Sequence, residues 1–403
     1  MQDILKPRDA ADVAAAIASA NEGGKRLEIV GQGSKRELGR ATQTDTTLDL
    51  SAISGITLYE PEELVLSARA ATPIAEIEKA LEAHKQELSF EPMDYGPLLN
   101  KPAGAGTIGG AVACGLSGPR RIKAGAARDF MLGVHAVSGR GERFKAGGRV
   151  VKNVTGYDLP RLFAGSWGTL AVMTDITLKV LPRAEDCATV LLFGASDTRA
   201  TEAMALAMGS SCEVSAAAHL PQWPADNIET LRAPGEAVTA LRLEGIAQSV
   251  AYRKEKLEEL LKPFGERGAL DAAASRAFWK SIRDVAPFAD RTERAVWKLS
   301  TTPSLAPGIA AGINASVGAQ YFYDWAGGLI WLEMPNEKPQ AGAVRTALAG
   351  RGHATLIRAT AAARAAADIF EPLDPVRAAV SQRLKESFDP KGVLNPGRMY
   401  AES

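Results

Sequence analysis

The stretch from Lys101 to Gly118 constrains the fold of this chain more than any other. It reads KPAGAGTIGGAVACGLSG, and six of the sixteen residues from Ala103 to Gly118 are glycine. Glycine permits positive φ angles and, because it has no Cβ, lets a backbone approach its neighbours closely. Small apolar residues are interleaved with these glycines, so the stretch is no flexible linker. It predicts either a tight turn into a buried helix or a backbone wrapped around a flat or anionic group.

A second glycine loop lies earlier in the chain. Leu27–Val30 reads as a short strand, and Gly31–Lys35 (GQGSK) follows it directly. Successive backbone N–H groups at the end of a strand suit a pyrophosphate. The loop is not a Walker A motif, and it is not the Rossmann fingerprint, because Arg36 stands where the third glycine is needed. A plain strand-end turn is the alternative interpretation.

The composition excludes several classes of protein. The 403 residues predict two or three domains, and 47 basic against 47 acidic residues give no reason to expect a nucleic-acid partner. Cys114, Cys187 and Cys212 lie far apart, which excludes a disulfide framework, a CxxC metal site and an iron–sulfur ligand set, and favours a reducing compartment. The N-terminus is polar, and no apolar run is long enough to span a bilayer. We therefore expect a cytoplasmic protein that reaches the inner membrane only through partners.

The pattern changes near Arg183. Leu170–Leu181 alternates as a strand pair that ends at Pro182. Beyond it, strands such as Val238–Glu244 alternate with helices such as Ile246–Leu261, which predicts a separate α+β layer. Val376–Phe388 is expected to form an amphipathic helix, followed by a turn-rich, ordered tail.

Four segments together carry a resemblance to a known family. They are GQGSK at 31–35, GTIGGAVACGLSG at 106–118 with ARDFMLGVHAVSGRGE at 127–142, KNVTGYDLPRLFAGSWGTLAVMTDITLKVLP at 152–182, and FDPKGVLNPG at 388–397. In this order they resemble the FAD-linked oxidase family of the vanillyl-alcohol oxidase type. The resemblance covers residues 1–182 and the tail, whereas the middle region matches by pattern only.

The resemblance implies an α+β fold in three parts. These are an FAD-binding domain of two subdomains (1–182), an α+β cap domain (183–360) and a C-terminal segment (361–403) that returns to the FAD domain. It also implies bound FAD. Because the 31–35 loop contains neither histidine nor cysteine, and Cys114 reads as a small buried residue, we expect the FAD to be non-covalent.

Site residues are carried over motif by motif. For the pyrophosphate they are Gly31, Gln32, Gly33, Ser34 and Lys35, and for the flavin side of the dinucleotide they are Thr107, Ile108, Gly109 and Gly110. The next matched stretch adds Ser117, Gly118, Arg128 and Asp129. The adenine or ribityl path adds Gly168, Thr169 and Val172, and the tail brings Asn395 towards the isoalloxazine. A cation at the N1–C2=O edge would stabilise a reduced flavin, and Arg128 and Lys152 are candidates.

The sequence departs from the family at the substrate site. Many relatives that oxidise 2-hydroxy acids carry paired, metal-binding histidines in the cap. Here His84, His135, His219 and His353 have no metal-ligand spacing, so we expect no metal and identify no catalytic base. The prediction is an FAD-carrying subunit, accessory or electron-transferring, of a multi-subunit 2-hydroxy acid (glycolate) oxidoreductase. A sister flavoprotein subunit would act on the substrate, and an iron–sulfur subunit would carry electrons onward.

Two alternatives remain open. One is a self-sufficient FAD-dependent D-2-hydroxy acid dehydrogenase, with Tyr321, Tyr323 or Glu333 as base and Arg242 or Arg358 holding the substrate carboxylate. The other is a non-enzymatic assembly subunit that has lost its cofactor, against which the retained glycines speak.

Overall fold

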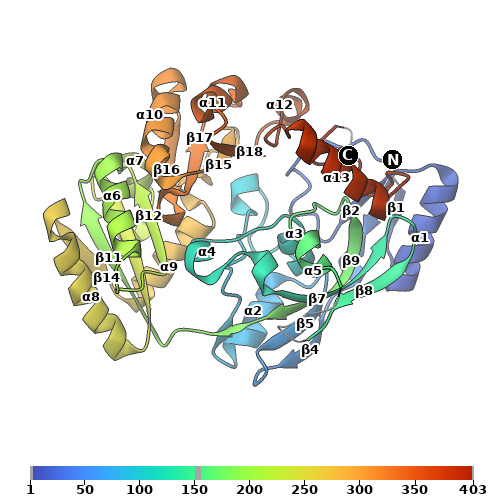
Figure 1. Ribbon diagram of the computed structural model, residues 1–403, viewed down its shortest axis with the longest axis horizontal. Helices are drawn as coiled ribbons and strands as arrows, with labels where there is room; N and C mark the ends of the chain where they lie inside the picture. The colour runs from blue at the N-terminus through green and yellow to red at the C-terminus, as the bar shows by residue number, and fades with distance from the viewer. Residues whose placement is uncertain (1–2, 150–155, 402–403) are drawn as a thin grey trace.

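The computed structural model of this protein describes residues 3–149 and 156–401. Figure 1 shows two bodies side by side: residues up to about Pro182 form one, and the eight-stranded sheet that follows forms the other. The predicted α+β class is confirmed. The predicted strand over 150–152 and the candidate Lys152 lie outside the described residues.

A small parallel sheet starts the first body. Its strands, in spatial order, are β1 (Asp3–Leu5), β3 (Thr46–Asp49) and β2 (Leu27–Val30). Helix α1 (Ala10–Gly23) begins at Asp9, whose carboxylate accepts hydrogen bonds from two backbone N–H groups of the first turn. The apolar face of α1 is buried with Leu27 and Leu48 of the sheet. This packing holds the C-terminal end of β2, from which the glycine loop emerges.

An antiparallel sheet completes the first body. Its strands, in spatial order, are β4 (Ile56–Glu60), β5 (Val65–Arg69), β9 (Ala171–Lys179), β7 (Met131–Ser138) and β8 (Arg143–Gly147). The helices of this body are α2 (Ile74–Glu82), α3 (Ile108–Ala113), α4 (Arg121–Ala124) and α5 (Leu159–Phe163). Ile77, Ile108 and Phe163 are fully buried in the core between helices and sheet. A short pair, β6 (Gln86–Glu87) with β10 (Leu181–Pro182), leads to the second body.

The second body is built on one eight-stranded antiparallel sheet, which we call the cap sheet. Its strands, in spatial order, are β14 (Arg267–Leu270), β11 (Asp186–Phe193), β13 (Val238–Gly245), β12 (Ala216–Leu220), β16 (Gln320–Asp324), β17 (Leu329–Glu333), β15 (Val296–Thr301) and β18 (Gly352–Arg358).

Helices cover both faces of the cap sheet. The outer face packs against α6 (Asp197–Met208), α8 (Ala247–Leu261), α10 (Ala306–Val317) and α11 (Ala341–Leu348). The inner face packs against α7 (Gln222–Asp226) and α9 (Ala272–Arg283). Part of this inner face is turned towards the first body.

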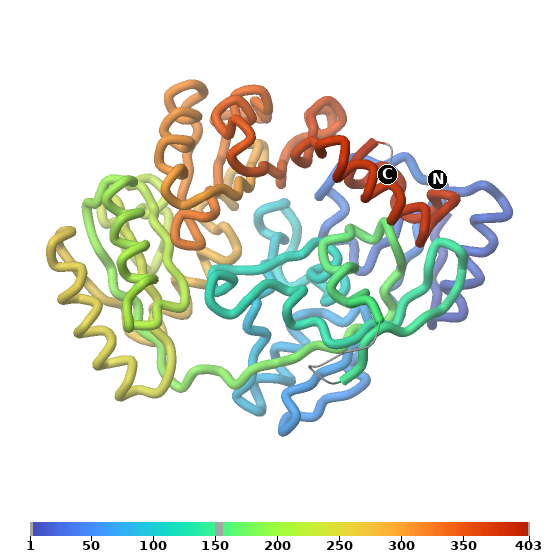
Figure 2. The backbone as a smooth tube through the Cα atoms, in the orientation of Figure 1, coloured from blue at the N-terminus to red at the C-terminus, as the bar shows by residue number. Residues whose placement is uncertain are grey.

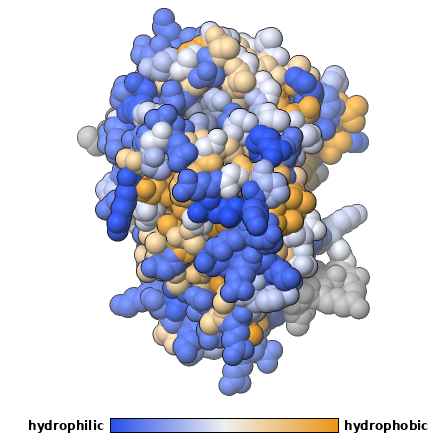
Figure 3. Space-filling model, turned by 90° about the vertical axis from the view of Figure 1, so that its left-hand side faces the viewer, coloured by the Kyte–Doolittle hydropathy of each residue, from blue (hydrophilic) through white to orange (hydrophobic). Residues whose placement is uncertain are grey.

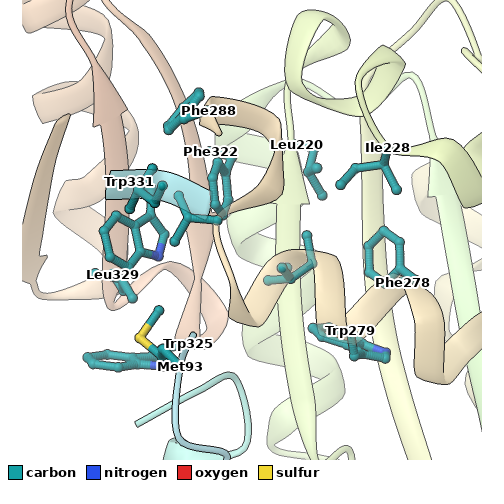
Figure 4. Close-up of a cluster of buried hydrophobic side chains, with 14 of the residues drawn as sticks. Met93, Leu220, Ile228, Phe278, Trp279, Phe288, Phe322, Trp325, Leu329 and Trp331 are labelled. Carbon is teal, nitrogen blue, oxygen red and sulfur yellow. The ribbon is translucent and has the colours of Figure 1, made fainter. Parts of the chain in front are cut away.

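An apolar cluster joins the inner face to the first body (Figure 4). Met93 and Tyr95 of the first body lie among Phe322, Leu329 and Trp331 of the cap sheet. The rings of Tyr95 and Trp331 meet edge to face at 6.2 Å between centroids.

Buried charges tie the two bodies together beside this cluster. The Arg120 guanidinium of the first body forms ion pairs with Glu87 and Glu91 and, at 3.5 Å, with Glu244 of β13. The Arg242 guanidinium lies 2.6 Å from the Glu91 carboxylate. Opposite charges hold the pKa of Glu91 at about 2 against the effect of its burial, so the carboxylate stays ionised.

The chain then returns to the first body. Helices α12 (Ala361–Ala366) and α13 (Pro375–Phe388) lead out of the cap sheet. Figure 2 shows this red segment running back to the blue N-terminal part. Leu394 pairs with Leu27 in a parallel bridge, which adds the tail to the edge of the small sheet. We propose that the domain boundaries lie at residues 182 and 360, and this arrangement of the chain supports the proposal.

Candidate functional site

One cleft gathers the two glycine loops and the tail. It encloses about 790 Å³, counting the part open to solvent. Its lining comprises Ile29, Val30, Gly31, Gln32, Gly33, Ser34, Lys35, Arg36, Leu50, Ala70, Ala71, Thr107, Gly109, Gly110, Ala113, Cys114, Trp167, Gly168, Ala171, Val172, Met173, Asn395 and Arg398. Segments from all through the first body and from the tail therefore meet at one site.

The first wall is the loop after β2, packed against the start of α3. A Cβ on Gly31 would lie 3.0 Å from Thr107 Oγ1, so a larger residue there would crowd the Thr107 side chain. Thr107 begins α3, and its hydroxyl accepts a hydrogen bond from the Gly110 N–H at 3.2 Å. The two glycine-rich stretches of the sequence are thus packed against each other, and both contribute to the lining of the cleft.

Two cations line the cleft without a counterion. Lys35 Nζ lies 3.4 Å from Ser34 Oγ, and Arg398 Nη2 donates to the carbonyl oxygens of Lys35 and Arg36. Within residues 3–149 and 156–401, neither cation has a carboxylate oxygen within 4.0 Å. Removal from water lowers the pKa of both Lys35 and Arg398. Positive charge that is partly removed from water in this way favours an anionic ligand.

The tail supplies the opposite wall through Asn395. Its Oδ1 accepts from the Ile29 N–H at 2.8 Å, and its Nδ2 donates to the Trp167 carbonyl oxygen at 2.8 Å. Asn395 has a φ of 42°, a left-handed conformation that asparagine tolerates better than most residues. A Cβ on Gly168 would lie 2.8 Å from Asn395 Nδ2. The Asn395 side-chain amide therefore joins β2 to the Trp167 loop through two hydrogen bonds, and it leaves no room for a side chain at Gly168.

A buried ion pair fixes the tail in this position. Lys385 Nζ donates to the carbonyl oxygens of Thr169 and Leu394 and, at 2.8 Å, to Asp389 Oδ2. The Asp389 carboxylate in turn accepts from the N–H groups of Val393 and Leu394. Lys385 and Asp389 are 6% and 2% exposed. Every polar atom of this pair that is removed from water is hydrogen-bonded, so the tail has one defined path to the cleft.

Much of the remaining lining is apolar. Leu50, Ala70, Ala71, Ala171 and Met173 contribute no charge. A ligand that fits the whole cleft combines an anionic centre, held by Lys35, Arg398 and the loop N–H groups, with a flat apolar part. A dinucleotide such as FAD has this combination, and the residues present fit it.

Most residues predicted for the site line the cleft. They are Gly31, Gln32, Gly33, Ser34, Lys35, Thr107, Gly109, Gly110, Gly168, Val172 and Asn395. Two neighbours point elsewhere. Ile108 is fully buried in the core under α3, and the Thr169 hydroxyl donates to the Ser166 carbonyl oxygen at 2.7 Å. Their predicted contact with the cofactor has no support in the cleft lining and stays a prediction.

Four further predicted residues lie outside the cleft lining. The Ser117 hydroxyl accepts from the Ala127 N–H, and the Gly118 carbonyl accepts from Trp325 Nε1 at 3.0 Å. The Asp129 carboxylate accepts from the Ala126 N–H, and the Arg128 side chain is 62% exposed. Ser117, Gly118 and Asp129 thus hold the segment between α3 and β7 in place. The structure does not bring these four residues together with the glycine loops.

Sequence reasoning missed part of the cleft. Arg398 follows Asn395 by three residues in the same motif, so its position was a usable signal. Trp167 stands directly before Gly168 and was equally accessible. Ala70, Ala71 and Met173 carry no such signal, because their side chains have no distinguishing chemistry and reach the site only through strand pairing.

The histidines lie apart from each other. His84 lies in the turn after α2, His135 is in β7, His219 is buried in β12 and His353 is in β18. A search of the described residues finds no group of three histidine, cysteine, aspartate or glutamate side chains that could hold a metal. It also finds no helix of the length and hydropathy needed to cross a membrane.

Replacing Lys35 with methionine is expected to weaken FAD binding about tenfold to a hundredfold, because one charge-assisted hydrogen bond to the pyrophosphate is lost. Quenching of FAD fluorescence on titration with apoprotein measures the change. Lys101→Met is the matched control, since Lys101 is exposed and pairs with Glu37 outside the cleft. Equal affinities of the two variants would contradict the assignment of Lys35.

Comparisons with known proteins agree with this geometry. Residues 2–147 match the family described as FAD binding domain, and residues 364–399 match the C-terminal domain of FAD linked oxidases. The glycolate oxidase subunit GlcE of Escherichia coli is 36% identical over 381 residues, which cover 93% of each chain. A D-lactate dehydrogenase of Archaeoglobus fulgidus is 31% identical over 45% of this chain and 39% of its own.

Solved structures show the same fold. A 4-ethylphenol oxidase of Gulosibacter chungangensis superposes with a TM-score of 0.74 at 13% identity, covering 99% of this chain and 89% of the other. A p-cresol methylhydroxylase gives the same TM-score at 13% identity, covering 99% and 88%. At this identity the likeness concerns the fold alone.

Proposed function

Because this chain belongs to the FAD-linked oxidases, we propose that it is the FAD-carrying subunit of a multi-subunit oxidoreductase that acts on glycolate or a similar 2-hydroxy acid. In this proposal it is an accessory or electron-transferring subunit. The observation that carries the proposal is a cofactor cleft beside a cap sheet whose candidate substrate-binding and catalytic side chains are already engaged within the protein.

The cleft supports the cofactor part of the proposal. Lys35 and Arg398 would neutralise the pyrophosphate, and Asn395 would hold the two walls at the distance that the dinucleotide needs. Bound FAD would supply two-electron acceptor chemistry. Because Lys35 and Arg398 are poorly solvated, their charges act strongly on any negative charge that develops nearby. No covalent link is part of the proposal.

The cap side chains support an accessory role. The Tyr321 and Tyr323 hydroxyls both donate to Asp197 Oδ2, on the outer face of the cap sheet. Glu333 is fully buried among Arg291, Arg294 and Arg358. The Tyr321 and Tyr323 hydroxyls and the Glu333 carboxylate are therefore all engaged within the protein. None of them is free to take a proton from a substrate. Arg242 is likewise paired with Glu91 and Glu244, so it offers no open fork to a substrate carboxylate.

The apolar cluster between the two bodies also supports an accessory role. Met93, Tyr95, Leu329 and Trp331 fill the space between the first body and the inner face of the cap sheet (Figure 4). A polar 2-hydroxy acid would have to displace these side chains. This favours a sister flavoprotein subunit as the site of substrate oxidation, with an iron–sulfur subunit carrying electrons onward.

One observation favours a second candidate. The D-lactate dehydrogenase of Archaeoglobus fulgidus is named for an activity on a 2-hydroxy acid and resembles 45% of this chain. A self-sufficient D-2-hydroxy acid dehydrogenase is therefore the alternative function. It requires a catalytic base that the residues considered above do not provide.

The proposed place of the protein is the cytoplasm, with contact to the inner membrane through partner subunits only. Three scattered cysteines, none of them in a disulfide, support a reducing compartment.

An anaerobic titration tests the proposal. The purified chain is expected to show a flavin absorption spectrum that does not bleach when glycolate is added. Bleaching is expected once the sister flavoprotein and iron–sulfur subunits are present. The control is dithionite, which must bleach the flavin of the chain alone.

Each other outcome selects another function. Bleaching of the lone chain by glycolate or D-lactate would establish the self-sufficient dehydrogenase. A colourless chain that does not bind added FAD would leave only the non-enzymatic assembly subunit.

A further inference from the structure

Three positively charged side chains from separate elements act on the imidazole of His353 in β18. They are Arg121 of α4, Lys298 of β15 and Arg377 of α13, and together with His353 we call them the cationic face. Burial lowers the pKa of His353, and the positive charges of Lys298, Arg121 and Arg377 lower it further against the opposing effect of Glu371. The three cations therefore act on the same space although they are far apart in sequence.

The charges of the cationic face are poorly compensated. The Trp325 ring has the Arg121 guanidinium 4.3 Å from its centroid and the Lys298 ammonium at 5.0 Å. In the part of the chain that the structure describes, neither cation has a carboxylate oxygen within 4.0 Å. Burial raises the pKa of Asp324, which faces Lys298, to about 8, so this carboxyl is mostly protonated at neutral pH. Within the described part of the chain, the ion-pair partner of Arg377 is the exposed Asp374.

Exposed apolar side chains flank these cations. Ile122, next to Arg121, is 37% exposed, and Val376 and Val380 on α13 are 73% and 50% exposed. Among the residues that the structure describes, helix α13 packs against the rest of the molecule through its last turn, at Leu384, Lys385 and Phe388, and residues 374–383 are exposed. A helix of this length is marginal in water without tertiary contacts, so its outward part requires a covering surface.

We propose that the cationic face, together with Ile122 and the exposed side of α13, docks an acidic surface with an apolar centre on the sister flavoprotein subunit. The proposal rests on the proposed function, since it takes the existence of that subunit from it. Charge complementarity identifies the occupant, because three uncompensated or weakly paired cations favour a negatively charged partner. The surface extends over four elements, so it is larger than one small carboxylate ligand could cover. The apolar flanks fit the buried centre of a protein interface.

Docking at this face also reaches the cofactor. The last turn of α13 contains Lys385, which donates hydrogen bonds to the carbonyl oxygens of Thr169 and Leu394, the sequence neighbours of the cleft residues Gly168 and Asn395. Ordering of α13 by the partner would restrain this lysine and, through it, the wall formed by Asn395. We expect the assembled chain to hold FAD more tightly than the free chain.

The test is binding of the FAD-loaded chain to the purified sister subunit, measured by biolayer interferometry at low and high salt. Two double variants change the surface: Arg121→Glu with Arg377→Glu, and Val376→Asp with Val380→Asp. Each is expected to weaken binding at least about tenfold, and the wild-type affinity is expected to fall with salt. An unchanged flavin spectrum and far-UV circular dichroism show that each variant is folded.

A matched control lies on the far end of the cap. Ile246 and Tyr252 are 61% and 60% exposed, beside and on α8, at the end of the molecule that Figure 3 presents. That face mixes hydrophilic side chains with scattered apolar ones. Ile246→Asp with Tyr252→Asp is expected to leave binding unchanged.

Three results would overturn the proposal in distinguishable ways. Wild-type binding that survives in both double variants would move the interface elsewhere and leave the proposed function intact. Absence of binding by the wild type would refute the proposed function, and this surface with it. Glycolate that quenches tryptophan fluorescence of the lone chain, but not of Arg121→Glu with Arg377→Glu, while assembly is unchanged, would assign the cations to a small carboxylate.

Discussion

Replacing Gly109 with alanine is expected to weaken FAD binding about thirtyfold and to destabilise the fold by about 2 kcal/mol. A Cβ at this position would lie 2.7 Å from the Ala70 carbonyl oxygen and 2.9 Å from the Ala70 Cβ. The Gly109 N–H donates to the same oxygen at 2.8 Å. Helix α3 would have to move away from the end of β5, and Thr107 and Gly110 would leave their places at the cleft with it.

Gly342→Ala is the matched control. Gly342 lies in α11, and a Cβ there would meet no atom within 4 Å. This change is expected to stabilise the protein by about 0.5–1 kcal/mol, because alanine is the better helix former. Urea unfolding and FAD titration measure both variants. If Gly109→Ala bound FAD as tightly as Gly342→Ala, the contact of α3 with β5 would not shape the cleft.

Replacing Lys385 with methionine is expected to cost about 3–5 kcal/mol of unfolding free energy, the range for a buried ion pair that loses one partner. The change leaves the Asp389 carboxylate buried without its cation and the Thr169 and Leu394 carbonyl oxygens without their donor. FAD affinity is expected to fall as well, because the tail then no longer holds Asn395 against the Trp167 loop.

Two further variants isolate the cause. Adding Asp389→Asn to Lys385→Met is expected to restore part of the stability, since the unpaired charge is removed. Lys391→Met in the same tail is expected to have little effect, because Lys391 is exposed and its ammonium donates to the Asn21 carbonyl oxygen, with no carboxylate partner among the described residues. A loss below about 1 kcal/mol for Lys385→Met would mean that water replaces the ammonium in the tail.

The sequence was informative where a residue type has few uses. The glycines of Gly31–Gly33 and of Gly109–Gly110 predicted close backbone approach, and the structure places them at the cleft with gaps that a Cβ would fill. Asn395 was found because its tail motif is distinctive. In each case the residue type itself carries the signal, because glycine has no side chain and asparagine tolerates a positive φ.

The sequence was less informative about where individual side chains point and about which surfaces pack together. Ile108 and Thr169 sit inside matched motifs, but the turn of α3 and the bend after Gly168 point their side chains away from the cleft. Helix α13 begins within one residue of the prediction, yet Val376 and Val380 are exposed where an amphipathic helix was expected to bury them. Such outcomes depend on which surfaces meet, and periodicity alone does not encode that.

The closure of the cleft by Asn395 sets the order of events when the protein is made. This side chain bonds Ile29 across 366 residues of chain and Trp167 across 228. On the ribosome, the glycine loop is complete early, but its opposite wall emerges only after the cap has been synthesised. The chain therefore becomes competent to capture FAD only when residues 385–398 have left the exit tunnel. A chain that stops before Lys385 would present the cell with an open, cofactor-free first body, a target for proteolysis rather than for assembly.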